Sequence, residues 1–535
     1  MNNPQYGVNA VRKYTPIEKA AQAALKEKFD DLVRATFLPV IKRTTTFHLV
    51  TDILATMVAQ GVGRRTISNA LVCQERDQKD WNPAYRAFAE SKWDPIDLFE
   101  GVFMAALRLV PPGGPIIIGI DDTGIPKTGN NLENAGWIHN PLIPKYVRPA
   151  IQWGIPMLHA ALLIPSDIVH RPMAITVAFE SIPKDKTDRK LGPKPKAKAN
   201  PEGKAKADPN TAAAPASPKR RGRPTKADSE RKKAERDAII QQTGEAEAAG
   251  AVNDVKLKST ELAVRVLWRI RRWMKKAGME DRILLVVGDG SYTNGTVIMG
   301  LPPNTEYAGR TRPDTKLQGM GTKTRAGKIQ YGENMPTPKV LAETHQLQVN
   351  VGKFDYAGAR RDLKFLAMGP VFRKTSTKKK LLRLMILEPV PYGRGKGKPK
   401  GYNLRAYLLT TDMNLPPETI IAAYLMRWEL EVLHRIFKTD LGIGTAQVRK
   451  NKLAAAMVSY YALLMIATRL TQGQVRHAGY GPLPKWIATR RAWFERTELA
   501  EGKPAPVYRP SPTEIKTLII RAMLPKGTRI HRLVA

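Results

Sequence analysis

Two short apolar runs constrain the fold of this chain more than any other feature. Residues 115–122 read PIIIGIDD, and residues 282–290 read RILLVVGDG. Runs of this kind are too short for helices and rich in β-branched residues, which is typical of strands buried on both faces of a sheet. We therefore expect an α/β fold in which helices cover a central sheet, with further strands at 155–164 and 173–181.

Both runs end in acids. Asp121 and Asp122 follow the first run, and Asp289 follows the second. Carboxylates at the carboxyl ends of buried strands commonly build divalent-metal sites, because Mg²⁺ prefers hard oxygen ligands and usually takes one or two carboxylates. Neighbouring strand residues point to opposite faces, so Asp121 and Asp122 are not both expected to reach the same ion in the same way.

A third acid lies on a predicted helix near the end of the chain. Residues 424–438 read YLMRWELEVLHRIFK, and steps of three, four and seven residues place four polar side chains within an arc of roughly 60°. These are Tyr424, Arg427, Glu431 and Lys438. Taken alone, the stripe is better explained as the solvated face of an amphipathic surface helix with an ordinary i,i+4 ion pair, so the rest of the chain must decide. Trp428 is expected to pack at the edge of this helix.

The charge of the chain indicates a polyanionic partner. The sequence contains 87 Lys+Arg against 48 Asp+Glu, a formal net charge of +39, and nucleic acid is the commonest partner for such a protein. A membrane surface would require a basic amphipathic helix or a lipidation signal, and neither is found. The single cysteine, Cys73, excludes a disulfide framework and fits a reducing compartment. The apolar stretch at 454–470 is interrupted by tyrosines and is expected to be a buried core helix.

The N-terminal region is predicted to be helical and to bind DNA. Residues 61–74, GVGRRTISNALVCQ, could form the turn and second helix of a helix-turn-helix, with Arg64 and Arg65 contacting phosphates. An ordinary helical hairpin is the alternative.

A basic segment interrupts the α/β pattern at 184–250. It is rich in Lys, Pro and Ala and has few large apolar residues, so we expect a disordered insertion with a helical end. Its RGRP sequence resembles an AT-hook, in which Arg221 and Arg223 would enter an A·T-rich minor groove. The alternative is a generic basic linker that binds any phosphate backbone. The expected divisions of the chain are 1–110, 111–183, 184–250, 251–310, 311–400, 401–445 and 446–535, with 311–400 as a β-rich insertion.

The three acidic elements together resemble a known family. The order IDDT, then VVGDG, then Y-x2-R-x3-E-x6-K is similar to that of DDE transposases of the insertion-sequence-4 type, which have a ribonuclease-H-like catalytic core. The resemblance implies that Asp121, Asp289 and Glu431 are catalytic ligands of Mg²⁺, with Mn²⁺ as a substitute. Relatives usually show Asp-x-Thr at the first strand, which favours Asp121 over Asp122 because Thr123 follows two residues later.

The resemblance also implies partners and an activity. Tyr424, Arg427 and Lys438 would contact DNA, and the enzyme would cut double-stranded DNA at transposon ends and join the freed 3′-hydroxyl to target DNA, as a homodimer in the cytoplasm or nucleoid. A nuclease that does not join strands and an inert DNA-binding regulator are the alternatives.

Two further expectations concern aromatic and histidine residues. Some relatives stack a flipped base on tryptophan, but the region between Asp289 and the late helix contains none, so hairpin formation is doubtful. Substitute stacking surfaces would be Tyr331, Tyr356 or Phe372. His139 and His159 lack metal-ligand spacing and are expected to be structural or to contact DNA.

Overall fold

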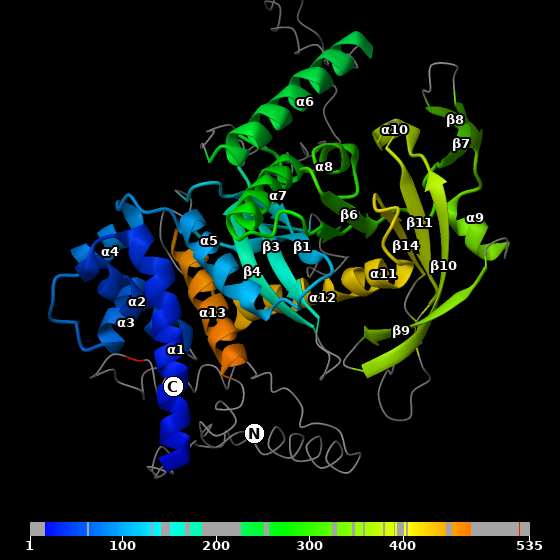
Figure 1. Cartoon of the computed structure of the whole chain (residues 1–535). Helices are drawn as coiled ribbons and strands as arrows, with labels where there is room; N and C mark the ends of the chain where they lie inside the picture. The colour runs from blue at the N-terminus through cyan, green and yellow to red at the C-terminus, as the bar shows by residue number, and fades with distance from the viewer. Residues whose placement is uncertain are drawn as a thin grey trace, which may run out of the picture.

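The computed structural model places helices on both faces of a long mixed sheet (Figure 1). It describes residues 16–60, 64–129, 132–140, 150–165, 172–183, 226–250, 256–323, 329–344, 348–356, 359–377, 380–389, 391–392, 401–402, 405–445, 452–471 and 524. The expectation of a mixed α/β fold is confirmed at this level.

The main sheet has ten strands, in the order β2-β3-β1-β5-β6-β14-β11-β10-β9, with β4 paired to β3. β1, β5 and β6 are parallel to one another, and the other neighbours in this sheet are antiparallel. The bounds are β1 Ile116–Pro126, β2 Gly136–His139, β3 Ile151–Ile164, β4 Met173–Ser181, β5 Leu284–Gly288, β6 Thr305–Arg310, β9 Asn350–Tyr356, β10 Ala359–Val371, β11 Leu382–Leu387 and β14 Ala406–Thr410.

The two apolar runs form the adjacent central strands β1 and β5, as their composition predicts. The pairing of β1 with β5 ends at Ile120 and Gly288, and in each case the next residue along the chain is an aspartate. The prediction that the first strand ends at its acids is wrong, because β1 continues to Pro126 along β3. What ends beside Asp121 is the pairing with β5, since the chain leaves the sheet after Gly288.

Helices cover both faces of this part of the sheet. Glu180 and Phe179 are neighbours on β4, so they point to opposite faces. Glu180 bonds to α7 (Ser259–Lys276), whereas Phe179 packs against Phe437 beyond α12 (Trp428–Arg435). β1 and β5 are therefore buried on both sides, which explains their uninterrupted apolar sequences.

The N-terminal helices share a core with a helix from the other end of the described chain. They are α1 Pro16–Ile41, α2 Thr44–Ala59, α3 Ile67–Cys73, α4 Asn82–Ala89, α5 Pro95–Ala106 and the 3₁₀ turn η1 Leu107–Leu109. α13 (Lys452–Leu470) packs against α1, α2, α5 and β4. By length and composition α13 could cross a membrane, but 89% of its apolar window is buried inside the fold. The prediction of a buried core helix is confirmed, and Cys73 is buried as well.

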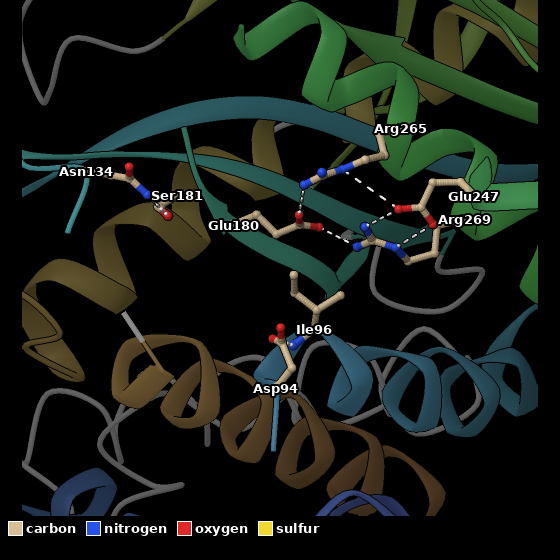
Figure 2. A network of polar contacts seen from close by, with 8 residues as sticks. All are labelled: Asp94, Ile96, Asn134, Glu180, Ser181, Glu247, Arg265 and Arg269. Atoms are coloured by element: carbon tan, nitrogen blue, oxygen red, sulfur yellow. Dashed lines mark hydrogen bonds and ion pairs between the residues drawn. The ribbon is translucent and has the colours of Figure 1, made fainter. Parts of the chain in front are cut away.

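The end of the basic insertion is the helix α6 (Lys226–Ala248), which packs along α7. Figure 2 shows the buried ion pairs that hold it: Arg269 Nη2 lies 2.9 Å from Glu247 Oε1 on α6, and its Nη1 bonds to Glu180 on β4. Arg265 contacts the same two carboxylates. The AT-hook-like segment with Arg221 and Arg223 lies outside the described residues.

The expected β-rich insertion is continuous with the main sheet. Its strands β9, β10 and β11 extend the sheet beyond β14, and the hairpin β7 (Gln318–Lys323) and β8 (Ile329–Asn334) lies beside them. The remaining elements are β12 Pro391–Tyr392, β13 Gly401–Tyr402, α8 Gly295–Met299, α9 Pro338–Glu343 and α10 Lys374–Thr377.

The helix that carries the polar stripe is divided. The sequence predicts one helix, but the structure has α11 (Pro417–Met426), a tight turn at Arg427, α12, and the π-helix η3 (Ile436–Asp440). The Arg427 N–H donates to Tyr424 O, three residues back, and Leu430 N donates to Arg427 O. These three-residue steps replace the usual four-residue bonds and separate α11 from α12.

Candidate active site

Asp121 and Asp289 occupy equivalent positions on neighbouring parallel strands. Each is the first residue after the in-register pair Ile120 and Gly288. Burial raises the pKa of Asp121 from 3.8 to about 6; Arg427 opposes this rise, and the nearby negative charge of Asp289 adds to it. A divalent cation between the two carboxylates would relieve both the desolvation and the repulsion.

A short turn holds the Asp289 carboxylate. Its Oδ1 accepts hydrogen bonds from Ser291 N at 2.9 Å and from Ser291 Oγ at 2.7 Å. Tyr292 N is 3.4 Å from the same oxygen. Within the described part of the chain the hydrogen bonds to this carboxylate all reach Oδ1, so Oδ2 can accept a ligand. Ser291 was not among the residues expected from the sequence, although Asp-Gly-Ser is a turn signal that could have indicated it.

Arg427 connects Asp121 to Glu431. Its Nη1 lies 2.9 Å from Asp121 Oδ2, and its Nη2 lies 2.8 Å from Glu431 Oε1. Burial lowers the pKa of the guanidinium, but Asp121, Tyr424 and Glu431 together outweigh it and raise the pKa above its usual value. The i,i+4 ion pair with Glu431 is therefore present, and the contact with Asp121 adds a link across 306 residues. Two elements that are distant in sequence, β1 and α12, thus meet at one guanidinium.

The other two residues of the stripe lie near the same carboxylates. Tyr424 is half-buried and burial raises its pKa, while the positive charge of Arg427 opposes the rise. The Lys438 side chain as a whole is exposed. Its amine is partly surrounded by protein, which lowers its pKa by desolvation, and the negative charge of Asp121 opposes this change. All four stripe residues therefore surround one site, despite the break in the helix.

Asp121 and its neighbour Asp122 point to opposite faces of β1. Asp122 is exposed, whereas Thr123 is buried on the same side of the strand as Asp121. Only the Asp121 side faces Arg427. The alternation thus favours Asp121 as the ligand, as the Asp-x-Thr frame predicts.

Two expectations about individual residues are wrong. Trp428 does not pack at the edge of the helix: it is the first residue of α12 and is 61% exposed. Arg65 is not placed to contact phosphate, because it is buried and its Nη2 donates to the carbonyl oxygens of Gln60 and Asp440, both at 3.0 Å. Arg64 is exposed and stays a predicted phosphate contact.

The proposed stacking residues differ in accessibility. Phe372 is fully buried against Tyr331, with ring centroids 5.5 Å apart, so it cannot stack on a base. Tyr331 and Tyr356 are half-buried. His159 is fully buried and bonded to other side chains, which confirms a structural role, whereas His139 is exposed.

The donor set fits a hard divalent cation. Asp121 and Asp289 supply two carboxylates on one edge, which is the number that Mg²⁺ usually takes from a protein, with water or substrate oxygens completing the octahedron. Within the described part of the chain no group of three His, Cys, Asp or Glu residues is gathered closely enough to hold an ion. Glu431, the expected third ligand, bonds instead to Arg427.

One comparison with known families matches this region. Residues 398–474 match the family model described as archaeal putative transposase ISC1217, a model of the DDE transposase class. The matched segment spans β14, α11, α12, η3 and α13 and so contains Glu431 and the whole polar stripe. The match supports a DDE transposase family for this chain. No curated protein matches the chain at a significant level.

Proposed function

We propose that this protein is a DDE transposase of the insertion-sequence-4 type, which cleaves transposon ends and joins the 3′-hydroxyl to target DNA. One observation carries the proposal: Asp121 and Asp289 lie at equivalent positions of adjacent strands and face, through Arg427, the helix that carries Glu431. That helix lies in the segment matched by the transposase model.

The strand order supports a ribonuclease-H-like core. From β4 through β3 and β1 the strands are antiparallel, and from β1 through β5 to β6 they are parallel. This is the arrangement expected of such a core, with the first acid on its central strand. The sheet then continues into β14, β11, β10 and β9, which would be additions to that core.

In the proposed reaction Asp121 and Asp289 would hold the cation, and Glu431 would be its third ligand in place of its ion pair with Arg427, which would leave Arg427 free to turn to the DNA. Bound Mg²⁺, or Mn²⁺ in its place, would stabilise the attacking and leaving oxygens of the phosphoryl transfer. Arg427 and Lys438 would hold phosphate oxygens beside the scissile bond, Arg427 through both of its terminal nitrogens. Tyr424 would donate its hydroxyl to a neighbouring phosphate. The exposed Trp428 provides an aromatic surface for a base next to these contacts.

The partner in this proposal is double-stranded DNA, at both transposon ends and target. The net charge of +39 would supply most of the affinity through contacts with phosphates. Two ends must be paired, which favours a homodimer on DNA, and the cytoplasm or nucleoid is the proposed location.

Two alternatives make different predictions. A nuclease with the same site would cut DNA but would give no joined product. An inert regulator would bind DNA and give neither product, although intact carboxylates on all three elements favour an enzyme.

The test uses duplexes that carry the terminal inverted repeats flanking the gene, together with Mg²⁺ and a supercoiled target plasmid. Wild-type protein should nick the ends and insert them into the plasmid. Asp289→Ala and Glu431→Ala should abolish both products while end binding stays within about twofold of wild type, since basic residues supply most of the affinity. Asp362→Ala, an exposed acid on β10, is the matched control and should react like wild type. Cleavage by either catalytic variant at the wild-type rate would falsify the assignment.

A further inference from the structure

A buried pair of histidines lies beneath the candidate site and takes no part in the proposed chemistry. His159 Nδ1 is 2.9 Å from His434 Nε2, and His159 Nε2 is 2.9 Å from Thr176 Oγ1. His159 is fully buried and His434 is 9% exposed. Burial lowers the pKa of both rings, so both are neutral near pH 7 and one donates its N–H to the other.

The pair joins β3, the strand that lies beside Asp121, to α12, the helix that carries Glu431. His159 on β3 is the residue directly opposite Asp121 in the pairing of β1 with β3. His434 lies three residues after Glu431, on the same side of α12. The hydrogen bond therefore links the strand beside Asp121 to the helix that carries Glu431, across 275 residues of sequence.

A second contact fixes α12 one turn earlier. A Cβ atom at Gly119 would lie only 2.6 Å from Leu430 Cδ1, so α12 packs closely against β1 here and a larger residue would force the Leu430 side chain to move. Gly119 lies on the same face of β1 as Asp121, two residues away. Leu430 and His434 are one helical turn apart, with Glu431 between them. The contact at Gly119 sets how close α12 lies to the sheet, and the histidine bond restricts its rotation.

The neighbouring aromatic contacts cannot set that rotation alone. Phe179 and Phe437 pack beside His159 with ring centroids 5.8 and 5.5 Å from it, but apolar contacts have little directional preference. A hydrogen bond is directional, and leaving its buried partners unsatisfied is costly.

We propose that His159 and His434 are positioning residues, whose hydrogen bond holds α12 at the rotation that presents Glu431 to the carboxylates of Asp121 and Asp289. This inference rests on the function proposed above. Neither ring is placed to touch DNA or the reacting phosphate, so both act through Glu431.

The test compares two substitutions of His434 in the full-length protein. His434→Phe keeps a ring but removes the hydrogen bond, and His434→Gln keeps a side-chain donor and acceptor. Mn²⁺ affinity is measured by electron paramagnetic resonance without DNA, and kcat and KM are measured for end cleavage. His434→Phe should weaken Mn²⁺ binding about tenfold or more and lower kcat by about 10–100-fold, as for other residues that orient metal ligands, with KM for DNA within about twofold. His434→Gln should restore both to within about threefold of wild type.

Two further variants separate positioning from general stability. Thr176→Val removes only the hydroxyl that bonds His159 and should still cause a several-fold loss of Mn²⁺ affinity in a folded protein. Ser459→Ala removes an equally buried hydroxyl on α13 and should lower the melting temperature without changing Mn²⁺ affinity.

Wild-type Mn²⁺ affinity and kcat in folded His434→Phe would refute the inference, and so would an equal loss of Mn²⁺ affinity in Ser459→Ala. If the wild type binds Mn²⁺ but cuts no DNA, the proposed function fails while the Mn²⁺ comparison still decides the role of the pair. Absence of Mn²⁺ binding by the wild type would refute both.

Discussion

Asp121→Asn should stabilise the protein at pH 8 but not at pH 4.5. The folded carboxyl has a pKa of about 6, against an ordinary value of 3.8, so between these values the folded chain binds the proton more tightly than the unfolded chain. Ionisation of Asp121 therefore destabilises the fold as pH rises through this window. At pH 8 this ionisation lowers the free energy of unfolding by about 3 kcal/mol. At pH 4.5 the carboxyl is largely ionised in the unfolded chain but not in the folded chain, and the loss is about 1 kcal/mol.

Asparagine removes this cost but also one acceptor. The carboxylate accepts from Arg427 through Oδ2 and from Asp122 N through Oδ1, and a single amide oxygen cannot replace both, a loss of about 1 kcal/mol at either pH. The expected net effect is a gain of about 2 kcal/mol at pH 8 and about zero at pH 4.5.

Urea unfolding in EDTA at the two pH values measures the difference directly. Asp362→Asn on β10 is exposed and serves as the control, with no expected change at either pH. An equal effect of Asp121→Asn at pH 8 and pH 4.5 would show that the carboxyl is not desolvated, and the reasoning about its environment would be wrong.

Four other outcomes are expected. Arg269→Met should destabilise the protein by about 3–5 kcal/mol in chemical unfolding, because it leaves two buried carboxylates short of a cation; an effect below about 1 kcal/mol would contradict this. Burial would raise the pKa of Glu180, but Arg269 and Arg265 together hold this pKa below its usual value. The free energy of unfolding of the wild type should therefore fall as the pH drops below the ordinary carboxyl pKa and through the lower pKa of Glu180 in the folded protein. Over the same pH range, the difference in stability between the wild type and Arg269→Met should become smaller. Arg65→Met should lower stability by about 1–3 kcal/mol, because it leaves buried carbonyl oxygens without their donor, whereas Arg64→Ala should leave stability unchanged and weaken DNA binding. Thermal unfolding measures the first effect and a filter-binding assay the second. Weaker DNA binding with unchanged stability in Arg65→Met would restore Arg65 as a phosphate contact. Deleting 184–225 while keeping α6 should leave thermal unfolding unchanged and reduce the slope of log affinity for DNA against log salt; an unchanged slope would mean that these lysines and arginines do not contact DNA.

The sequence was sufficient to locate β1 and β5, because short runs rich in β-branched residues, such as PIIIG, are typical of strands covered on both faces. It also placed Asp289 beside the first acid, since parallel strands end at a common edge. The pairing of β9, β10 and β11 with β14 could not be predicted, because partner strands are chosen by contacts distant in sequence.

The details of the site depend on tertiary contacts in the same way. A helical projection treats 424–438 as one continuous helix, whereas the structure divides it at Arg427, leaves Trp428 exposed and pairs the guanidinium with Asp121. His434 was overlooked because its partner, His159, is 275 residues away, and no local spacing signals such a pair. Arg65 appeared basic and accessible because the carbonyl of Asp440 that it binds comes from the other end of the chain.

The packing of α13 among the N-terminal helices has a consequence for synthesis of the chain. α1, α2 and α5 emerge from the ribosome first, but the helix that completes their core begins only at Lys452. At about 5–20 residues per second, the ribosome needs on the order of half a minute to translate the stretch between α5 and α13. During that interval the apolar faces of the early helices must be tolerated or shielded. A truncated mRNA that ends before the codon for Lys452 should therefore yield an unstable fragment that proteases degrade. Such a fragment should not accumulate and compete with the intact protein.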